Sequence, residues 1–319
     1  MKTYSDAPLQ RISLNGETMG TRYSAVFYAA PGHDIEAIGA TLHAAVDQVD
    51  CQMSSWKPAS DLCRLNAAPE HTWIGVPDEL IRVLEAGVQV GLQSRGRFDM
   101  GVGRLVEAWG FGPAPGTPGR PPAPQSHYHA AGEALYIDRA GGRVRKRWPL
   151  ALDLCGIAKG FGVDQLAHCL DAWGIANYLV GIDGEMRARG SKPGAGAWAV
   201  ALERPSYGVR EAGGVMELHD AAIATSGDYR RWRDVDGKRY AHTMDPARQQ
   251  PVSNRIAAVT VVAPTCMLAD AWATALLVLG EQDGVALARE RAVDALFVMR
   301  DGERLEEILI IDGRLCGPD

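Results

Sequence analysis

The sequence predicts a mixed α/β chain (α+β) that is rich in antiparallel hairpins. Two turn signals, Asp236-Gly237 and Ala140-Gly141-Gly142, lie between segments with strand patterns, which is typical of β-hairpins. Other segments, above all residues 35–53 and 266–279, carry apolar residues at helical spacing or along their whole length. No fixed-period repeat interrupts this mixture, so a repeat architecture is not expected.

The individual elements follow from local patterns in chain order. Strands are expected at residues 21–28, 134–137, 143–152, 178–182, 198–202, 229–233, 238–242 and 256–262. Helices are expected at 35–53, 77–94 and 266–279. In addition, residues 153–159 should lead from a strand into a helix that ends at Gly174. Thr265 should cap the last helix and Gly280 should stop it. The Asp236-Gly237 turn sets a register in which His242 lies across from Arg231.

Length and composition allow one large globular domain or two closely packed halves, and we expect a single domain over residues 1–319. The chain is 46% hydrophobic and 23% charged, which is the usual balance of a globular protein with a sizeable core. One segment, residues 112–126, is so dense in Pro and Gly that it predicts a loop without helix or strand, and we place this loop within the domain.

Charge and hydropathy limit the partners and the location. The 33 basic and 39 acidic residues leave a formal charge of -6, which argues against nucleic acid as a partner. No stretch is long and apolar enough to span a membrane, and the first residues lack the apolar core of a secretory signal. The six cysteines are scattered without a C-x-x-C pair, as expected for free thiols. We therefore expect a cytoplasmic protein, or a periplasmic one if a leader was trimmed.

The helix over residues 266–279 carries the first candidate site. It is apolar nearly all round, and Asp270 is its only charge, so a cationic group must face that carboxylate. Thr274 lies one turn later on the same face. A carboxylate and a hydroxyl in this arrangement suit Mg²⁺. An Asp270 paired with a buried arginine, with Thr274 bonded back to the helix carbonyls, explains the same pattern equally well.

The second candidate site runs from Leu152 to Asp164. It brings Asp153 to a turn of small residues, and Lys159 stands at the start of the next helix, where it can meet a phosphate or another acidic group. The Gly156 carbonyl could serve as an oxygen ligand. The segment lacks Walker spacing, and the chain has no G-x-G-x-x-G motif. Taken alone, these glycines are better explained by tight packing.

The third candidate site begins at Thr225-Ser226-Gly227 and continues through the hairpin to His242. Small hydroxyl residues before a glycine suggest a strand edge that a ligand approaches. His242 could act as a general base near neutral pH, although a lone histidine on a hairpin is more often structural.

These segments together resemble the ApbE family, the FAD:protein FMN transferases. The matching motifs, in the family's order, are Met19-Gly-Thr21, Met53-Ser-Ser-Trp56 with Ser60-Asp61 and Asn66, Phe98-Asp-Met-Gly-Val-Gly103, Trp109-Gly-Phe-Gly112, Asp153-Leu-Cys-Gly-Ile-Ala-Lys-Gly160, Thr225-Ser-Gly-Asp-Tyr229, His242-Thr-Met-Asp-Pro246 and Ala269-Asp-Ala-Trp-Ala-Thr274. Each motif is weak alone, but their common order over most of the chain makes the resemblance strong.

The resemblance implies a mixed α/β fold with an FAD cleft, in which a threonine hydroxyl of a target flavoprotein attacks the FMN-side phosphorus of FAD and AMP leaves. It implies that Asp270, Thr274 and the Gly156 carbonyl hold Mg²⁺, with Mn²⁺ as the other candidate, and that Asp270 and His242 serve the reaction. The residues it places in contact with FAD are Met19, Trp56, Arg97, Phe98, Asp99, Asp153, Lys159 and Met244.

The chain departs from the family pattern at three places. Trp56 replaces a tyrosine, Asp183-Gly184 replaces a Gly-Gly pair, and residues 245–251 lack the usual Thr-Gly turn. Two other functions therefore stay open: an FAD pyrophosphatase that releases FMN and AMP, and a catalytically weak FAD-binding protein. Retention of Asp153, His242, Asp270 and Thr274 favours an enzyme, because a pure binder would not need this polar set.

Overall fold

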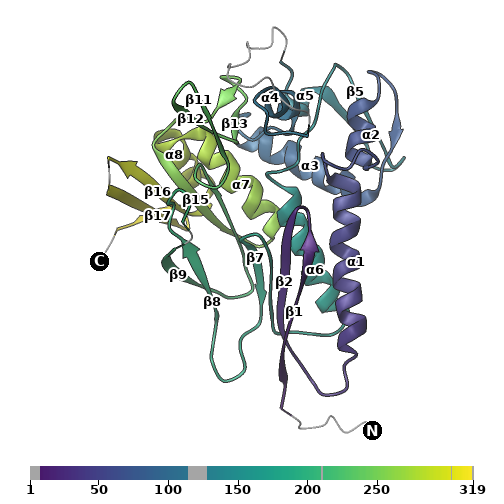
Figure 1. Cartoon of the computed structure of the whole chain (residues 1–319), viewed down its shortest axis with the longest axis vertical. Coiled ribbons are helices and arrows are strands. Elements are labelled where there is room, and N and C mark those ends of the chain that lie inside the picture. Colours follow the sequence, from purple (N-terminus) through teal and green to yellow (C-terminus); the bar gives the residue numbers. More distant parts are fainter. Residues whose placement is uncertain (1–7, 114–127, 210, 303, 318–319) are drawn as a thin grey trace.

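The computed structural model describes residues 8–113, 128–209, 211–302 and 304–317. Of the Pro- and Gly-rich loop expected at 112–126, residues 114–126 lie outside the described residues. Strands and helices alternate irregularly along the chain (Figure 1), which confirms the mixed α/β class.

An antiparallel sheet forms the frame of the fold. Within the described residues it has nine strands in the order β1-β2-β6-β7-β10-β15-β16-β17-β18, and each neighbouring pair is antiparallel. These strands are β1 (Gln10–Thr18), β2 (Thr21–Ala29), β6 (Tyr178–Ile182), β7 (Glu185–Arg189), β10 (Ala222–Gly227), β15 (Ile256–Ala263), β16 (Asp294–Asp301), β17 (Arg304–Ile311) and β18 (Arg314–Cys316). The sheet therefore joins segments from both ends of the chain.

Smaller strands and the helices complete the fold. The smaller sheets contain β3 (Ile74–Gly75), β4 (Leu135–Asp138), β5 (Arg143–Lys146), β8 (Trp198–Glu203), β9 (Ala212–Leu218), β11 (Trp232–Val235), β12 (Lys238–Ala241), β13 (Met244–Asp245) and β14 (Gln250–Pro251). The helices are α1 (Ile35–Met53), α2 (Asp61–Ala67), α3 (Asp78–Gln93), η1 (Met100–Val102), α4 (Gly103–Ala108), α5 (Ala131–Ala134), α6 (Ala158–Ala172), α7 (Cys266–Leu279) and α8 (Glu281–Arg291). No helix within these ranges has the length and apolar character needed to cross a bilayer.

The two faces of the sheet are covered by different elements. On β2, Tyr23 and Phe27 belong to a core that also contains residues of α1 and α6. Val26 and Tyr28, which alternate with them, instead pack with Trp198 of the β8–β9 ribbon. Because successive side chains of a strand point to opposite faces, helices cover one face of the sheet and the β8–β9 ribbon covers part of the other.

Helix α7 has the bounds and caps that the sequence predicts. The Thr265 side chain accepts a hydrogen bond from the Leu268 N–H, and Gly280 follows the helix with a φ of 83°. The helix packs against α6, β10 and β15. A Cβ on Gly160 of α6 would lie 2.3 Å from the Cys266 carbonyl oxygen, so the close crossing of α6 and α7 requires a glycine there.

The approach to Asp153 differs from the prediction. Strand β5 ends at Lys146, and residues 151–154 form no strand, so the expected strands through Leu152 and Asp153 were wrong. The Leu152 N–H donates to the Asn66 side-chain oxygen at 2.8 Å, and the Asn66 amide donates to the Leu152 carbonyl at 2.9 Å. One side chain thus takes the hydrogen bonds that a neighbouring strand would have supplied. Pro149 also interrupts the strand pattern.

The hairpin β11–β12 has the predicted turn and register. Asp236 and Gly237 adopt φ angles of 51° and 75°, which a type I′ turn requires. The His242 N–H donates to the Arg231 carbonyl at 3.1 Å, so these two residues lie opposite each other as expected. The first strand is shorter than predicted, because it begins at Trp232 instead of Tyr229.

Candidate active site

A cleft of about 920 Å³ brings distant parts of the chain together. Its volume lies in the range of small-molecule sites, about 300–1,000 Å³. Every site residue named from the sequence lines this cleft: Met19, Trp56, Arg97, Phe98, Asp99, Asp153, Gly156, Lys159, His242, Met244, Asp270 and Thr274. They come from both ends of the chain, which only the tertiary fold brings together.

Asp270 and Thr274 point from α7 into this cleft. Asp270 is only 4% exposed, and one of its carboxylate oxygens accepts the Gly160 N–H at 3.1 Å. Burial, together with the negative charge of Glu185, raises the pKa of Asp270 to about 7, although Lys159 opposes this shift. Among the described residues Asp270 forms no ion pair, so the explanation by a buried arginine is wrong. Thr274 bonds to the Ser226 hydroxyl at 2.9 Å.

Gly156 lies directly beside Thr274. A Cβ placed on Gly156 would be 3.0 Å from the Thr274 hydroxyl oxygen, so a larger residue would crowd the hydroxyl. The backbone carbonyl of Gly156, the Thr274 hydroxyl and the Asp270 carboxylate are all oxygen donors, which hard cations such as Mg²⁺ prefer. Across the described ranges, no three His, Cys, Asp or Glu side chains form a metal cluster. A cation here would therefore be held by one carboxylate, neutral oxygens and substrate phosphates, a pattern typical of Mg²⁺ sites.

Lys159 meets acidic groups, one of the two outcomes expected from the sequence. Its ammonium group donates to Glu185 and lies 3.9 Å from an Asp183 oxygen. Burial alone would lower the pKa of Lys159, but the charges of Glu185 and Asp270 outweigh burial and raise it. The second oxygen of Glu185 is buried and has no hydrogen-bond partner among the described residues. The lysine therefore stays charged and ties α6 to β7.

Residues 97–99 contribute unequally to the cleft. The Arg97 guanidinium lies 3.3 Å from Asp245, and Phe98 is buried beneath the cleft surface. Both oxygens of Asp99 are already engaged, since one accepts the Tyr128 hydroxyl at 2.6 Å and the other accepts the N–H groups of Gly101 and Ala131. Asp99 thus holds the wall of the cleft, and its carboxylate is not free for a ligand.

His242 combines partial burial with an open ring nitrogen. Its Nδ1 is buried and has no hydrogen-bond partner in the described part of the chain. Burial, reinforced by the positive charges of Arg231 and Lys159, lowers the pKa of His242 to about 4. The imidazole is therefore neutral at pH 7 and can accept a proton.

The remaining predicted residues lie around the rim and floor. Trp56 is 58% exposed and offers a flat stacking surface, whereas Met244 is buried. Met19 occupies the β1–β2 turn with a φ of 48°. The Asp153 carboxylate accepts the Cys155 N–H at 2.9 Å, which shapes the turn before α6, and burial raises the pKa of Asp153.

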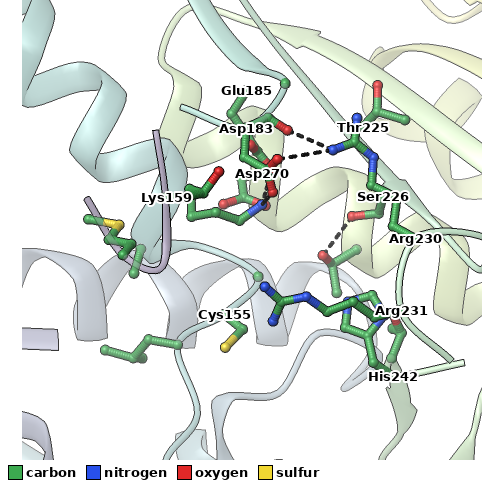
Figure 2. A pocket seen from close by; sticks show the side chains of 18 of the residues that line it. Cys155, Lys159, Asp183, Glu185, Thr225, Ser226, Arg230, Arg231, His242 and Asp270 are labelled. Atoms are coloured by element: carbon green, nitrogen blue, oxygen red, sulfur yellow. Dashed lines mark hydrogen bonds and ion pairs between the residues drawn. The ribbon is translucent and has the colours of Figure 1, made fainter. Parts of the chain in front are cut away.

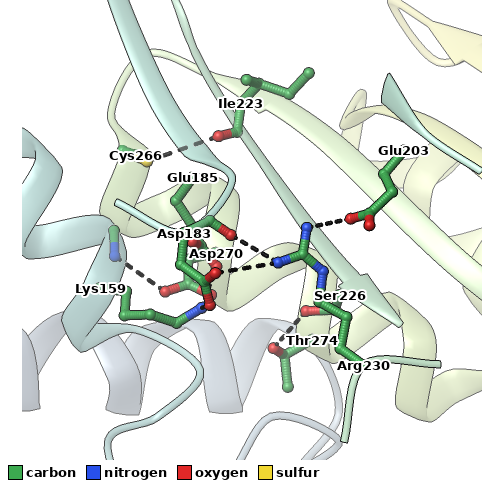
Figure 3. A network of polar contacts seen from close by, with 11 residues as sticks. Lys159, Asp183, Glu185, Glu203, Ile223, Ser226, Arg230, Cys266, Asp270 and Thr274 are labelled. Carbon is green, nitrogen blue, oxygen red and sulfur yellow. Dashed lines mark hydrogen bonds and ion pairs between the residues drawn. The ribbon is translucent and has the colours of Figure 1, made fainter. Parts of the chain in front are cut away.

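A network of charges in the cleft was missed by the sequence reasoning. Arg230 donates to the backbone and side-chain oxygens of Asp183, at 2.9 and 3.3 Å, and also to Glu203 (Figure 3). Asp183 stands where the family pattern has glycine, and it accepts the left-handed conformation with a φ of 51°. Ser226, which holds Thr274, was signalled only by the small hydroxyl residues before Gly227. For Glu185, Glu203 and Arg230 the sequence held no signal, because their partners lie on other elements that are distant in the chain.

The altered turn after Asp245 keeps its geometry. Met244 and Asp245 pair with Gln250 and Pro251 across it, and one Asp245 oxygen accepts the Ala247 N–H at 3.0 Å. Gln249 takes the position of the missing glycine with a φ of 53°. The loss of the Thr-Gly pair therefore leaves the turn in place at the edge of the cleft.

Comparisons with known proteins agree with this geometry. The family model described as the ApbE family matches residues 19–297. A curated FAD:protein FMN transferase of Vibrio cholerae is 34% identical over 95% of this chain and 91% of its own length, and one of Haemophilus influenzae is 35% identical over 91% and 86%.

Solved structures agree as well. The flavin transferase ApbE of Vibrio cholerae superposes with a TM-score of 0.84 at 34% identity, covering 95% of this chain and 98% of the other. The apo form of the Pseudomonas stutzeri flavinyl transferase ApbE superposes with a TM-score of 0.84 at 33% identity, covering 98% and 99%.

Proposed function

Because this chain belongs to the ApbE family, we propose that it is an enzyme that transfers FMN from FAD to a target protein. One observation carries the proposal for this chain: a buried carboxylate and a hydroxyl on α7 meet the Gly156 turn in the same cleft as a neutral histidine. Phosphoryl transfer depends mainly on positioning and charge neutralisation, and this arrangement supplies both.

The cofactor of this proposal is Mg²⁺, with Mn²⁺ as the other candidate. Asp270, Thr274 and the Gly156 carbonyl would hold the cation, and the donor set fits a hard ion that also binds phosphate oxygens. When bound, the cation would neutralise the pyrophosphate and the charge of the leaving AMP.

FAD is proposed to lie along the remaining walls of the cleft. Trp56 gives a surface for stacking at the rim, and Met19, Phe98 and Met244 give apolar contacts. Arg97, Asp153 and Lys159 supply polar groups. Asp99 contributes through the wall that it holds together, because both of its carboxylate oxygens are occupied.

His242 is proposed to take the proton of the acceptor hydroxyl, which we place on a threonine of a target flavoprotein. The hydroxyl oxygen forms a bond to the FMN-side phosphorus. The bond from this phosphorus to the bridging oxygen breaks, and its electron pair leaves with AMP. The nucleophile comes from the partner, which agrees with the absence of a nucleophilic serine paired with His242 among the described side-chain contacts.

The proposed location is the cytoplasm. The six cysteines are all free in this structure, as is usual in a reducing compartment.

The direct test is incubation of the purified protein with FAD and Mg²⁺, with and without a domain that carries the threonine acceptor. AMP release and the mass of the acceptor are followed. Covalent flavin on the acceptor that is lost with EDTA is the expected result. AMP and free FMN without a covalent product would show a pyrophosphatase, and tight FAD binding without turnover would show a binding protein.

A further inference from the structure

The cationic side chains that line the cleft differ in whether a carboxylate neutralises them. Lys57 lies 2.8 Å from Asp50, and Arg97 lies 3.3 Å from Asp245. Lys159 pairs with Glu185, and Arg230 with Glu203 and Asp183. These four positive charges are already compensated within the protein.

Arg231 is the exception. Within the described ranges no carboxylate lies within 4.0 Å of its guanidinium, and its side chain forms no hydrogen bond. Figure 2 shows the guanidinium extending into the cleft toward Cys155, away from the neighbouring Arg230. Adjacent arginines thus have opposite roles: one is tied into the wall, and the other presents an uncompensated charge to the cavity.

The backbone holds Arg231 beside His242, the proposed base. Its carbonyl accepts the His242 N–H at 3.1 Å, and it directly precedes β11. Its positive charge adds to the effect of burial in lowering the pKa of the His242 imidazole. The guanidinium therefore places its positive charge in the part of the cleft between the 153–159 turn and His242.

The chemistry of the guanidinium and its place in the cleft indicate which anion Arg231 binds. A guanidinium is planar, always charged and matched to phosphate oxygens. In the proposed reaction, the anionic group next to the proton acceptor is the phosphoryl group that receives the hydroxyl. We propose that Arg231 binds a non-bridging oxygen of the FMN-side phosphate of FAD, as a substrate-contacting residue. This assignment rests on the proposed function, since it requires FAD in this cleft.

The test compares Arg231→Met with Arg233→Met. Arg233 lies two residues along the same hairpin, does not line the cleft, and its removal takes away the same charge. Dissociation constants for FAD, FMN and riboflavin are measured with Mg²⁺ by flavin fluorescence. We expect Arg231→Met to weaken FAD and FMN about 10-fold or more, the size of a lost charge-assisted hydrogen bond. Riboflavin, which lacks phosphate, should change less than about 2-fold, and Arg233→Met should spare all three ligands.

Three results would overturn the assignment. Unchanged FAD affinity in Arg231→Met would exclude the contact, and equal loss of riboflavin would show a structural role. A loss for FAD without a loss for FMN would place the contact on the AMP-side phosphate. If the unaltered protein bound no FAD, the proposed function itself would fail, whatever the variant did. Arg231→Lys should recover part of the affinity, because it restores the charge but not the planar fork.

Discussion

At the scale of single residues, the protonation of Asp270 makes the stability of the metal-free protein depend on pH. Its burial raises its pKa to about 7, above the value of about 3.9 in an unfolded chain. As pH rises, the Asp270 carboxyl group therefore releases its proton at a lower pH in the unfolded chain than in the folded protein. The metal-free protein should therefore lose stability as pH rises from about 4 to about 7, by an amount on the order of 4 kcal/mol.

Asp270→Asn should remove this pH-dependent loss and also abolish metal-dependent turnover, while keeping an oxygen that can accept the Gly160 N–H. Urea unfolding in EDTA at pH 5 and pH 8, together with AMP release in Mg²⁺, measures both effects. Persistent activity in the variant would remove Asp270 from the proposed metal site.

For His242 the pKa shift and the resulting pH dependence of stability have the opposite sign. Its pKa of about 4 lies below the usual value of about 6.5, so the unfolded chain binds the proton more readily. Stability should fall as pH drops from about 6.5 to about 4, by roughly 3 kcal/mol, and His242→Gln should lose this dependence. The same variant should slow transfer while sparing FAD affinity. If FAD affinity collapsed instead, His242 would be a binding residue and not a base.

At the scale of elements, the crossing of α6 and α7 sets the geometry of the proposed metal site. A Cβ on Gly160 would lie 2.3 Å from the Cys266 carbonyl and 2.9 Å from the Asp270 Cβ. Gly160→Ala must therefore push the helices apart, at a cost of about 1–3 kcal/mol. It should also displace Asp270 and weaken Mg²⁺ binding.

Gly39→Ala in α1 is the matched control. A Cβ on Gly39 meets only the Leu14 side chain at 3.6 Å, an ordinary contact, so alanine should stabilise that helix by about 0.5–1 kcal/mol. Thermal melts and Mg²⁺ titration of both variants distinguish the crossing from a general effect of alanine. Normal metal affinity in Gly160→Ala would contradict the dependence of the site on helix spacing.

Elements whose signals are local were predicted well. Thr265 and Gly280 delimit α7, and Asp236-Gly237 fixes both the turn and the register that places His242 opposite Arg231. The segment around Asp153 was predicted wrongly because its backbone hydrogen bonds go to the Asn66 side chain, 86 residues from Leu152, and to Met100 and Gly103, none of which lies in a strand. Distant partners of this kind leave no periodic signal in the sequence.

At the scale of the whole molecule, local sequence patterns predicted part of the site but not the long-range contacts around it. Asp270 and Thr274 were found from helical spacing, whereas most of the other cleft residues came from the resemblance to the family. The order of strands in the sheet and the pairing of Arg230 with Glu203 depend on contacts between remote segments, which local patterns do not encode. The organisation of residues 1–319 as one domain stays a prediction.

The charge of the assembled cleft leads to the last prediction. Seven acidic residues (Asp50, Asp99, Asp153, Asp183, Glu185, Glu203 and Asp270) and five cationic ones (Lys57, Arg97, Lys159, Arg230 and Arg231) line it, so their formal sum is 5 − 7 = −2. The FAD pyrophosphate would add further negative charge to this site. FAD and Mg²⁺ should therefore bind with positive coupling, each raising the affinity of the other by the same factor.

We expect this factor to be about 10-fold, and we expect Asp270→Asn to reduce it to nearly one. Calorimetric titration of FAD in Mg²⁺ and in EDTA, and of Mg²⁺ with and without FAD, closes the thermodynamic cycle. Equal FAD affinity in both buffers would show that the protein's own cations, Lys159 and Arg231 among them, suffice to hold the pyrophosphate. The cation would then have no part in binding, and its role would have to be sought in the transfer step alone.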